Sequence, residues 1–490
     1  MADLHDLLAL IRARTPLIVI ETREELHVSE LLQQGAATIQ LPLFRWSITE
    51  GLHRQETGYQ PQRHNIPPGE VLSHIKASRV PGVYLLIDFH PYLDEARNIR
   101  LLKEIALQAE RTGQSLVLLS FRLRLPAELE HLSATFTLEP PDAESRSAIV
   151  DEIVAEWQRQ SGGQASVDSD VQKTLVRNLT GLTASEVRRL VRNAIFDDGV
   201  LNDDDLPGVA RRKYELLNRG GVLSFEPDTA AYADIGGLEN LKHWLEQRRV
   251  AFAGVNDVSG LPTPKGILLL GVQGCGKSLA AKAIAGSWGL PLLQLDLGAA
   301  YHKYYGETER NLRESLQAAE AMAPSVLWID EIEKGLAVDQ DDSLSRRVLG
   351  TLLTWMAERD AQVFIVATAN DISTLPPELV RKGRLDEIFF VDLPDSETRK
   401  EIFTIHLQKR GYKADTFELD VLSELAAGFS GAEIEQVVVA ALYSSLGGVG
   451  SIDQQLLENE IARTRPLSIV MGERIAALRH WASGRTVPAN

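Results

Sequence analysis

Short apolar runs alternate along the chain with longer stretches in which apolar residues recur every three or four positions. The first pattern is typical of buried strands and the second of amphipathic helices, so the sequence predicts an α/β fold with a mainly parallel sheet. In the second half, the expected strands are GILLLG (266–271), PLLQLDL (291–297), VLWID (326–330) and VFIVATA (363–369). In the first half, they are PLIVIE (16–21), PLFRWS (42–47), VYLLID (83–88) and SLVLLS (115–120).

The two halves also share a segment of thirteen residues. LEPPDAESRSAIV (138–150) and VDLPDSETRKEIF (391–403) are identical at five positions, including Asp142 and Asp395. We expect each segment to leave a sheet and enter a helical lid, with the aspartate capping the first lid helix. The number of residues between corresponding strands of the two halves is nearly the same as that between the two copies of the segment. This constancy predicts two modules of similar architecture, although an unrelated α/β domain in the first half stays an alternative.

These patterns divide the chain into six parts, and an acidic segment that contains Pro207 connects the two halves. We expect a degenerate α/β domain that lacks a phosphate-binding loop (1–150), a helical lid-like segment (151–200), a linker (201–225), a second α/β domain that has this loop (226–395), its helical lid (396–462), and a final helix and tail (463–490).

Length and composition are those of a folded protein with several domains. The chain has 490 residues, a hydrophobic content of 44% and a net charge of -17, which repels phosphate backbones and argues against nucleic acid as a partner. A single cysteine excludes an internal disulfide and fits a reducing compartment. No apolar run approaches the roughly 20 residues of a membrane helix, and the N-terminus does not resemble a secretory signal. We therefore expect a cytoplasmic protein, or one of the plastid stroma, with no membrane partner.

The stretch GVQGCGKS (271–278) follows an expected strand and precedes an expected helix, which is the context of a phosphate-binding loop. Its glycines let backbone N–H groups surround phosphate oxygens, its lysine reaches the β- and γ-phosphates, and its serine can bind Mg²⁺. Cys275 inside the loop is either a small residue or a redox-sensitive thiol. The predicted ATP contacts are Gly271, Val272, Gln273, Gly274, Cys275, Gly276, Lys277, Ser278 and Leu279.

Two polar strand ends complete the expected chemistry. VLWIDE ends in Asp330 and Glu331, which suit a Mg²⁺ ligand and a residue that orients or deprotonates the attacking water. FIVATAN places Asn370 at the end of another strand, where an amide can orient the same water. Farther on, RKGRLDE carries Arg381 and Arg384, which form either a solvated basic turn or an arginine finger that reaches a neighbouring subunit's nucleotide.

In this order, the motifs resemble those of the AAA ATPases. The resemblance covers about 226–462 and rests on DIGGLENLK, GVQGCGKS, KYYGETERNLR, VLWIDE, ATAN, RKGRLDE and GFSGAEIE. More narrowly, LFRWSITEGL, RRVLGTLLTWMAE and RPLSIVMGERIAALRHWA resemble the plastid and bacterial AAA-domain proteins first recorded as a hypothetical chloroplast reading frame.

The resemblance implies ATP and Mg²⁺ as cofactors and self-association into a ring, with a hexamer expected. It implies that Arg381 and Arg384 are the finger residues, and that Lys303, Tyr304 and Tyr305 form a pore loop whose aromatic Tyr304 grips a protein client. The segment GAEIE has no arginine, which speaks against a sensor arginine in the lid. The further nucleotide contacts that it implies are Asp234, Ile235, Gly236, His406, Gly431 and Ala432.

The first half lacks the residues for this chemistry. After PLIVIE the sequence continues TREELHVSEL, with no glycine before Gly35, and Phe89 follows Asp88 where the second half has Glu331. We predict no ATP hydrolysis in residues 1–200. The function expected for the whole chain is an ATP-hydrolysing, ring-forming remodeller of a protein client. The alternatives are a nucleotide-dependent regulatory switch or assembly scaffold without threading, and a nucleic-acid-linked loader, against which the net charge argues.

Overall fold

The computed structural model describes residues 2–490 except 56–64, 164–165, 197–198, 218–221, 253–261, 301–306, 337–342, 373–374, 377, 380, 382 and 447–450. The chain forms two compact units, Met1–Pro141 and Asp142–Asn490. Within the described part of the chain, every helix is too short or too polar to cross a membrane.

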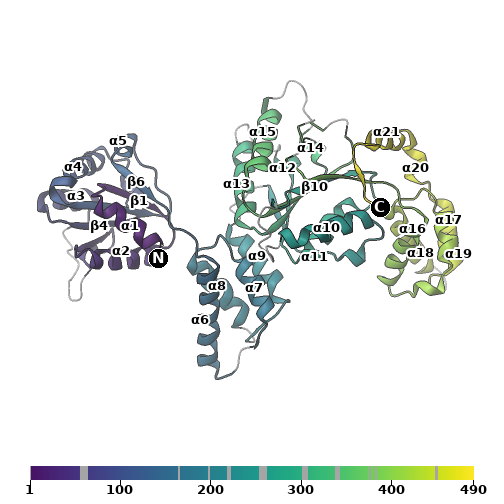
Figure 1. Ribbon diagram of the computed structural model, residues 1–490, viewed down its shortest axis with the longest axis horizontal. Coiled ribbons are helices and arrows are strands. Elements are labelled where there is room, and N and C mark those ends of the chain that lie inside the picture. Colours follow the sequence, from purple (N-terminus) through teal and green to yellow (C-terminus); the bar gives the residue numbers. More distant parts are fainter. Residues whose placement is uncertain are drawn as a thin grey trace. The chain divides into compact units, whose positions relative to one another are not determined.

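The first unit is a three-layer α/β domain (Figure 1). Its sheet has the order β3-β2-β4-β5-β1-β6, and only β2 and β3 pair antiparallel. Ile18 and Ile20 pack in the core beneath α1 and α2, whereas Leu17 and Val19 pack beneath α3 and α4, because side chains alternate along a strand. The strands are β1 (Leu17–Glu21), β2 (Leu43–Ser47), β3 (Gly51–Arg54), β4 (Gly82–Ile87), β5 (Gln114–Ser120) and β6 (Ser133–Phe136). The helices are α1 (Ala2–Arg12), α2 (Glu25–Thr38), α3 (Pro68–Ser78), α4 (Ala96–Thr112) and α5 (Ala127–Glu130).

The second unit begins with a helical domain. The Asp142 side chain accepts a hydrogen bond from Ser145 N and caps α6, as predicted from the repeated segment. The boundary expected at residue 150 therefore falls inside a helix, and the expected linker 201–225 is largely α9 followed by a strand. The helix in this segment was not predicted, because the acidic cluster at its start resembles a connection between domains. The elements are α6 (Ala143–Ser161), β7 (Ser166–Val167), α7 (Ser169–Asn178), α8 (Ala184–Ile195), β8 (Val200–Leu201) and α9 (Asp205–Leu217).

A buried lysine joins this helical domain to the sheet domain that follows. Lys213 on α9 is 1% exposed, and its Nζ donates to Asn178 O and Thr180 O, both at 2.8 Å, at the C-terminal end of α7. The same ammonium lies 3.5 Å from Ala323 O in the sheet domain. Burial lowers the pKa of Lys213 to about 7. Backbone carbonyls thus provide the acceptors that a buried ammonium needs.

Among the described residues of the second unit's sheet domain, the strands have the order β15-β14-β10-β13-β12-β11-β9. Only β9 pairs antiparallel with its neighbour. Helices α10 and α11 cover one face, and α13 and α15 cover the other (Figure 1). The strands are β9 (Leu223–Glu226), β10 (Gly266–Gly271), β11 (Leu292–Leu295), β12 (Ser325–Ile329), β13 (Val363–Ala369), β14 (Glu387–Val391) and β15 (Val487–Pro488). The helices are α10 (Glu239–Phe252), α11 (Lys277–Trp288), α12 (Leu297–Ala300), α13 (Glu307–Ala321), α14 (Ile332–Leu336) and α15 (Ser343–Glu358).

The two sheets have the same central strand order. The first contains β2-β4-β5-β1-β6 and the second β11-β12-β13-β10-β14. The first four strands of each order correspond in the pairs expected from the repeat, and β6 takes the place of β14. This agreement favours two modules of common architecture over an unrelated first domain. The α/β fold with parallel sheets, read from the apolar runs, is confirmed.

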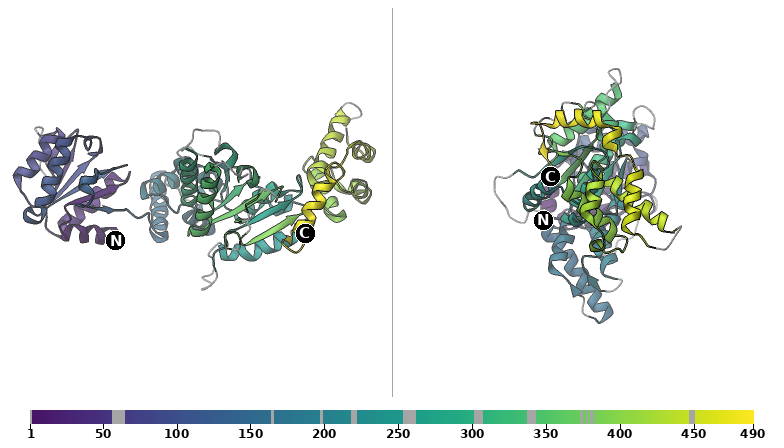
Figure 2. Two further views of the ribbon diagram at one scale, coloured as in Figure 1. Left: turned by 90° about the horizontal axis from the view of Figure 1, so that it is seen from above. Right: turned by 90° about the vertical axis from the view of Figure 1, so that its right-hand side faces the viewer.

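In the part of the chain that the structure describes, the helices between residues 396 and 463 form the lid, which packs around Phe403 and Val438. Asp395 caps α16 by accepting from Thr398 N at 2.8 Å, which confirms the second predicted cap. After the lid the chain returns to the sheet, where β15 pairs with β14, and Figure 2 places its end where the sheet meets the lid. The elements are α16 (Ser396–Gln408), α17 (Leu419–Leu425), α18 (Gly431–Leu446), α19 (Gln454–Arg463), α20 (Leu467–Val470) and α21 (Gly472–Ala482).

Candidate nucleotide-binding site

The loop between β10 and α11 has the conformation that its glycines permit. Gly274 and Gly276 have φ values of 79° and 88°, in the left-handed region that side chains disfavour. Gly276 precedes the first residue of α11, a helix of twelve residues. The N-terminal N–H groups of such a helix lack partners within it and carry partial positive charge, which suits an anion.

Lys277 lies inside this loop. Its side chain is 6% exposed, and its Nζ donates to Gly271 O at 2.9 Å and to Val272 O at 2.8 Å. Burial lowers the pKa of Lys277 to about 8, and the nearby acidic residues, including Glu333 and Asp330, act in the opposite direction. Two of the predicted loop contacts, Gly271 and Val272, thus hold the lysine instead of lining the cavity described below.

Three oxygen-bearing side chains meet at the ends of β12 and β13. Asp330 Oδ1 accepts from Ser278 Oγ at 3.1 Å and from Thr368 Oγ1 at 2.6 Å. Thr368 is 1% exposed and also accepts from Glu331 N at 2.9 Å, so one hydroxyl fixes both acidic residues. The sequence predicts no role for Thr368, although this residue stands two positions before Asn370 in the strand FIVATAN.

Glu331 and Asn370 form a second hydrogen-bonded pair. Asn370 Nδ2 donates to Glu331 Oε1 at 2.8 Å, and Glu331 also forms an ion pair with Lys334. The backbone of Glu331 has φ 45°, an uncommon value for a non-glycine residue, which the bond to Thr368 helps to hold. Asn370 N donates to Glu333, and burial raises the pKa of that second glutamate.

A cavity of about 660 Å³ collects most of the predicted site residues. The lid closes one side of it, because Ala432 N donates to Gly274 O at 2.9 Å. Its lining includes 234–236, 273–279, Asp330, Glu331, Asn370, His406, Gly431 and Ala432. Burial lowers the pKa of His406, whose Nδ1 lies 3.5 Å from Glu435 Oε1, and Glu435 in turn accepts from Arg410 Nη2 at 2.9 Å.

Arg381 and Arg384 lie between β13 and β14, outside this cavity. Arg384 Nη1 donates to Glu378 O, and Arg381 is exposed. Among the described residues that line the cavity, none is an arginine. Lys303, Tyr304 and Tyr305, the expected pore loop, lie outside the described residues.

Comparisons with known proteins agree with this geometry. The model of the "ATPase family associated with various cellular activities (AAA)" matches residues 267–393. The "Uncharacterized AAA domain-containing protein ycf46" of Pyropia yezoensis is 34% identical over 485 residues, covering 98% of this chain and 97% of that protein. The chain belongs to the AAA ATPase family. The resemblance read from its motifs, including that to the chloroplast reading frame, is thereby confirmed.

Other relatives of this AAA ATPase match the whole chain or its second half. The ycf46 protein of Guillardia theta is 34% identical over 494 residues, covering 99% of this chain and 95% of that protein. The proteasome-activating nucleotidase of Saccharolobus solfataricus is 36% identical over 233 residues, covering 45% of this chain and 58% of that protein. Models of the N-terminal and second domains of SpoVK-like AAA ATPases match residues 4–138 and 144–220, on either side of the break between the two compact units.

In the described residues of the first unit, the catalytic and phosphate-binding groups of the second unit have no counterparts at the corresponding strand ends. Only residues 22–24 separate β1 from α2, too short a connection to surround a triphosphate. Phe89, which follows Asp88, is fully buried and packs against Trp46 with ring centroids 5.3 Å apart. An aromatic core thus fills the position that corresponds to Glu331.

Proposed function

We propose that residues 226–462 bind ATP with Mg²⁺ and hydrolyse it, and that the assembled protein uses this cycle to remodel a protein client. The observation that carries the proposal is the single cavity in which the phosphate loop, the acidic pair, Asn370 and the lid converge. In it the Lys277 ammonium would leave its two carbonyl partners for β- and γ-phosphate oxygens, which are stronger acceptors because they are charged.

The residues beside the loop suit Mg²⁺. Ser278 Oγ and Asp330 Oδ1 are oxygen donors 3.1 Å apart, and oxygen ligands are those that Mg²⁺ prefers. Within the described part of the chain, no group of three or more His, Cys, Asp or Glu side chains could hold a metal ion by itself. That fits an ion shared with substrate phosphates and water. Bound there, Mg²⁺ would neutralise negative charge on the phosphates.

Glu331 is the proposed general base. Its carboxylate is held by Asn370 at one oxygen and its backbone by Thr368, so its position near the cavity is fixed before substrate arrives. It would accept a proton from the attacking water while Asn370 orients the carboxylate, the water or both.

The proposed ring follows from the missing arginine. Phosphoryl transfer is accelerated by an arginine that stabilises charge on the transferring group. The described residues around the cavity supply none, while Arg381 and Arg384 lie outside it. We infer that these two arginines complete the cavity of a neighbouring subunit, in a ring that we expect to be a hexamer.

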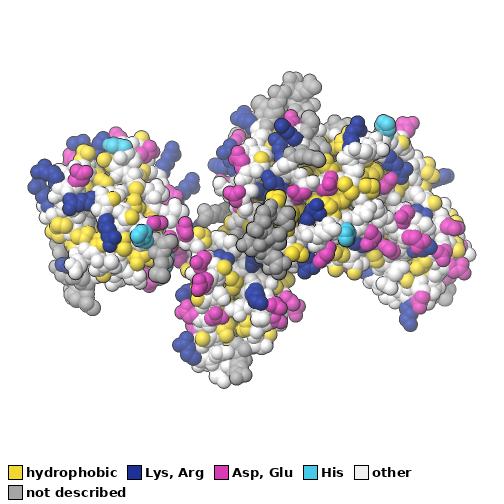
Figure 3. Space-filling model, viewed as in Figure 1, with side chains coloured by type: hydrophobic (Ala, Val, Ile, Leu, Met, Phe, Trp, Pro, Cys, Tyr) yellow, Lys and Arg dark blue, Asp and Glu magenta, His cyan; other side chains and the backbone are white. Residues whose placement is uncertain are grey.

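A protein client is favoured over nucleic acid. Figure 3 shows Lys and Arg side chains scattered among Asp and Glu on the face in view, without a continuous basic stripe. The name of the archaeal relatives, proteasome-activating nucleotidase, links a similar ATPase domain to protein handling. We propose Tyr304, flanked by Lys303 and Tyr305, as the residue that grips the client. The location of the protein, in the cytoplasm or a plastid stroma, stays a prediction from the sequence.

A mixing experiment tests the shared site. Arg384→Ala subunits keep a complete cavity but lack the finger, whereas Glu331→Gln subunits supply the finger but lack the base. Each variant alone should hydrolyse ATP poorly, and an equal mixture should regain activity at about a quarter of its interfaces if subunits exchange at random. A mixture as inactive as its components, under conditions where the wild type forms rings, would contradict a finger in trans.

The client is tested separately. The Glu331→Gln variant should bind ATP without turnover and retain the client for identification by mass spectrometry. Tyr304→Ala should then abolish processing of that client and leave the basal ATPase activity nearly normal. Tyr304→Phe, which keeps the aromatic side chain, should still process the client. Normal processing by Tyr304→Ala would favour the alternative, a nucleotide-dependent switch or scaffold without threading.

A further inference from the structure

Residues 487–490, here called the strap, bring a distant part of the sequence into the wall of the nucleotide cavity. Val487 and Pro488 pair in parallel with Phe389 and Phe390 of β14, and Ala489 N donates to Phe390 O at 3.0 Å. Ala489 is 1% exposed, so the strap is anchored in the core of the sheet domain. Pro488, Ala489 and Asn490 all line the cavity.

The strap also supplies hydrogen-bond acceptors to the start of α10. The first N–H groups of a helix have no partner within it. Leu241 N donates to Ala489 O at 3.1 Å, and Leu238 N donates to Asn490 Oδ1 at 2.7 Å. Leu238 has φ 60°, an uncommon value for leucine, and its bond to Asn490 helps to hold this turn. The partners are 252 residues apart in sequence.

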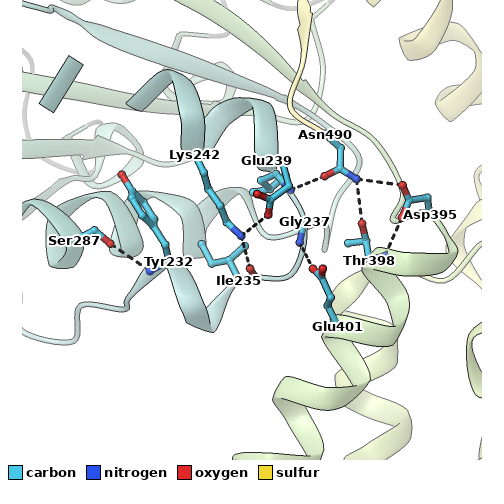
Figure 4. A network of polar contacts seen from close by, with 11 residues as sticks. Tyr232, Ile235, Gly237, Glu239, Lys242, Ser287, Asp395, Thr398, Glu401 and Asn490 are labelled. Atoms are coloured by element: carbon cyan, nitrogen blue, oxygen red, sulfur yellow. Dashed lines mark hydrogen bonds and ion pairs between the residues drawn. The ribbon is translucent and has the colours of Figure 1, made fainter. Parts of the chain in front are cut away.

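The other half of the same carboxamide contacts the lid. Asn490 Nδ2 donates to Thr398 Oγ1 at 3.0 Å and to Asp395 Oδ2 at 3.4 Å, both at the first turn of α16 (Figure 4). Its oxygen faces an N–H donor and its nitrogen faces a carboxylate, so only this orientation of the amide satisfies every partner. One side chain therefore bridges the two bodies that enclose the cavity.

Neighbouring contacts reinforce this junction. Gly237 N donates to Glu401 Oε2 of α16 at 2.8 Å, beside the strap (Figure 4). Upstream of the strap, Arg479 of α21 forms a forked ion pair with Asp392, at 2.8 to 3.0 Å, and Asp392 also lines the cavity. The lid leaves the sheet through residues 392–395, so these contacts lie around its hinge.

Building on the proposed function, we propose that Asn490 is a positioning residue for nucleotide binding, and that the strap holds the lid at the angle that closes the cavity around ATP. A lid joined only by its covalent hinge would sample open orientations, and the apparent affinity falls with the fraction of molecules in the competent state. Because the carboxamide contacts both bodies, its loss removes one of the hydrogen-bonded links between them.

The experiment compares four full-length proteins: wild type, Asn490→Ala, Asn490→Asp, and Asn490→Asp combined with Asp395→Asn. Titration of a fluorescent ATP analogue with Mg²⁺ should give about tenfold weaker binding for Asn490→Ala. Asn490→Asp should bind nucleotide at least as weakly as Asn490→Ala. It keeps the acceptor for Leu238 N, but it turns a second carboxylate toward Asp395, and the two negative charges repel each other. The double variant should recover most of the affinity, since an amide at position 395 can donate to a carboxylate at 490 and still cap α16.

Hydrogen exchange of the nucleotide-free proteins gives a second, independent readout. Asn490→Ala should exchange faster at Leu238 and in the first turn of α16, whereas Asn459→Ala, at an exposed lid asparagine on α19, should match the wild type in both assays. Unchanged affinity and exchange in Asn490→Ala, or no recovery in the double variant, would refute the positioning role. Tighter binding by a variant lacking residues 487–490 would also refute it, because the strap would then obstruct the site. A wild type that binds no nucleotide would overturn the proposed function as well, whereas normal wild-type binding confines the failure to the strap.

Discussion

Removal of the Thr368 hydroxyl tests whether one buried group holds the catalytic carboxylates in place. In Thr368→Val, Asp330 loses a donor at 2.6 Å and the Glu331 N–H loses an acceptor at 2.9 Å. The side chain is 1% exposed, so water does not replace these partners readily. A hydrogen bond to a charged group contributes about 1.5–3 kcal/mol, and an unsatisfied buried N–H costs about 1–3 kcal/mol.

Part of this loss should lower stability and part should lower the rate. If about 2–3 kcal/mol is expressed in the transition state, kcat falls about 30- to 160-fold. Phosphate release at saturating ATP measures this effect, and nucleotide titration should show a much smaller change in affinity, because Thr368 touches the acidic pair and not the phosphate loop. Thr368→Ser keeps the hydroxyl and should stay within about fivefold of wild type. Comparable activity of Thr368→Val and Thr368→Ser, whether both high or both low, would refute the role of the hydroxyl.

Two further predictions concern the helix caps and the thiol. Asp142→Ala and Asp395→Ala should each lower the free energy of unfolding by about 1 kcal/mol in denaturant titrations. Only Asp395→Ala should also weaken nucleotide binding, because, of these two residues, only Asp395 lines the cavity. Equal weakening of nucleotide binding by both variants would contradict this prediction. Bonds from Thr398 lower the pKa of Asp395, so its stabilising effect is complete above the ordinary value of about 3.9 and is lost as pH falls through the lower folded value. Burial raises the pKa of Cys275 to about 12, so alkylation of this thiol at pH 8 should be very slow. Peroxide should inhibit the ATPase activity of the wild type and of Cys275→Ala equally. Inhibition of the wild type alone would identify a redox switch.

The long apolar runs made most of the fold predictable. All eight strands expected from them are present, and both aspartate caps could be anticipated because Pro-Asp before a helical pattern is a local signal. The short edge strands β9 and β15 could not be read in this way. Their identity depends on pairing with β11 and β14, which lie far away in the sequence.

In the candidate site too, some residues can be predicted from local sequence and others depend on contacts between distant segments. Lys277, Asp330 and Glu331 stand in motifs whose chemistry is explicit, and the fold brings them to one cavity. Thr368 stands in the motif ATAN, but no role for its hydroxyl could be predicted from that motif, and Asn490 stands in no motif. A hydroxyl inside a strand and an amide at position 490 acquire their contacts only when distant segments meet. Sequence therefore locates the groups that handle phosphate better than those that hold them in place.

Lys213 bears on where this protein can be divided. A gene fragment that begins at residue 226, at the edge of the AAA motifs, would discard the lysine together with most of β9. The backbone edge of β11 would then be uncovered, and an unpaired edge strand invites aggregation. A fragment that begins at residue 142 keeps the lysine, its carbonyl partners and the covered edge. The practical unit for expression, and for exchange of the first module against another, therefore starts at Asp142.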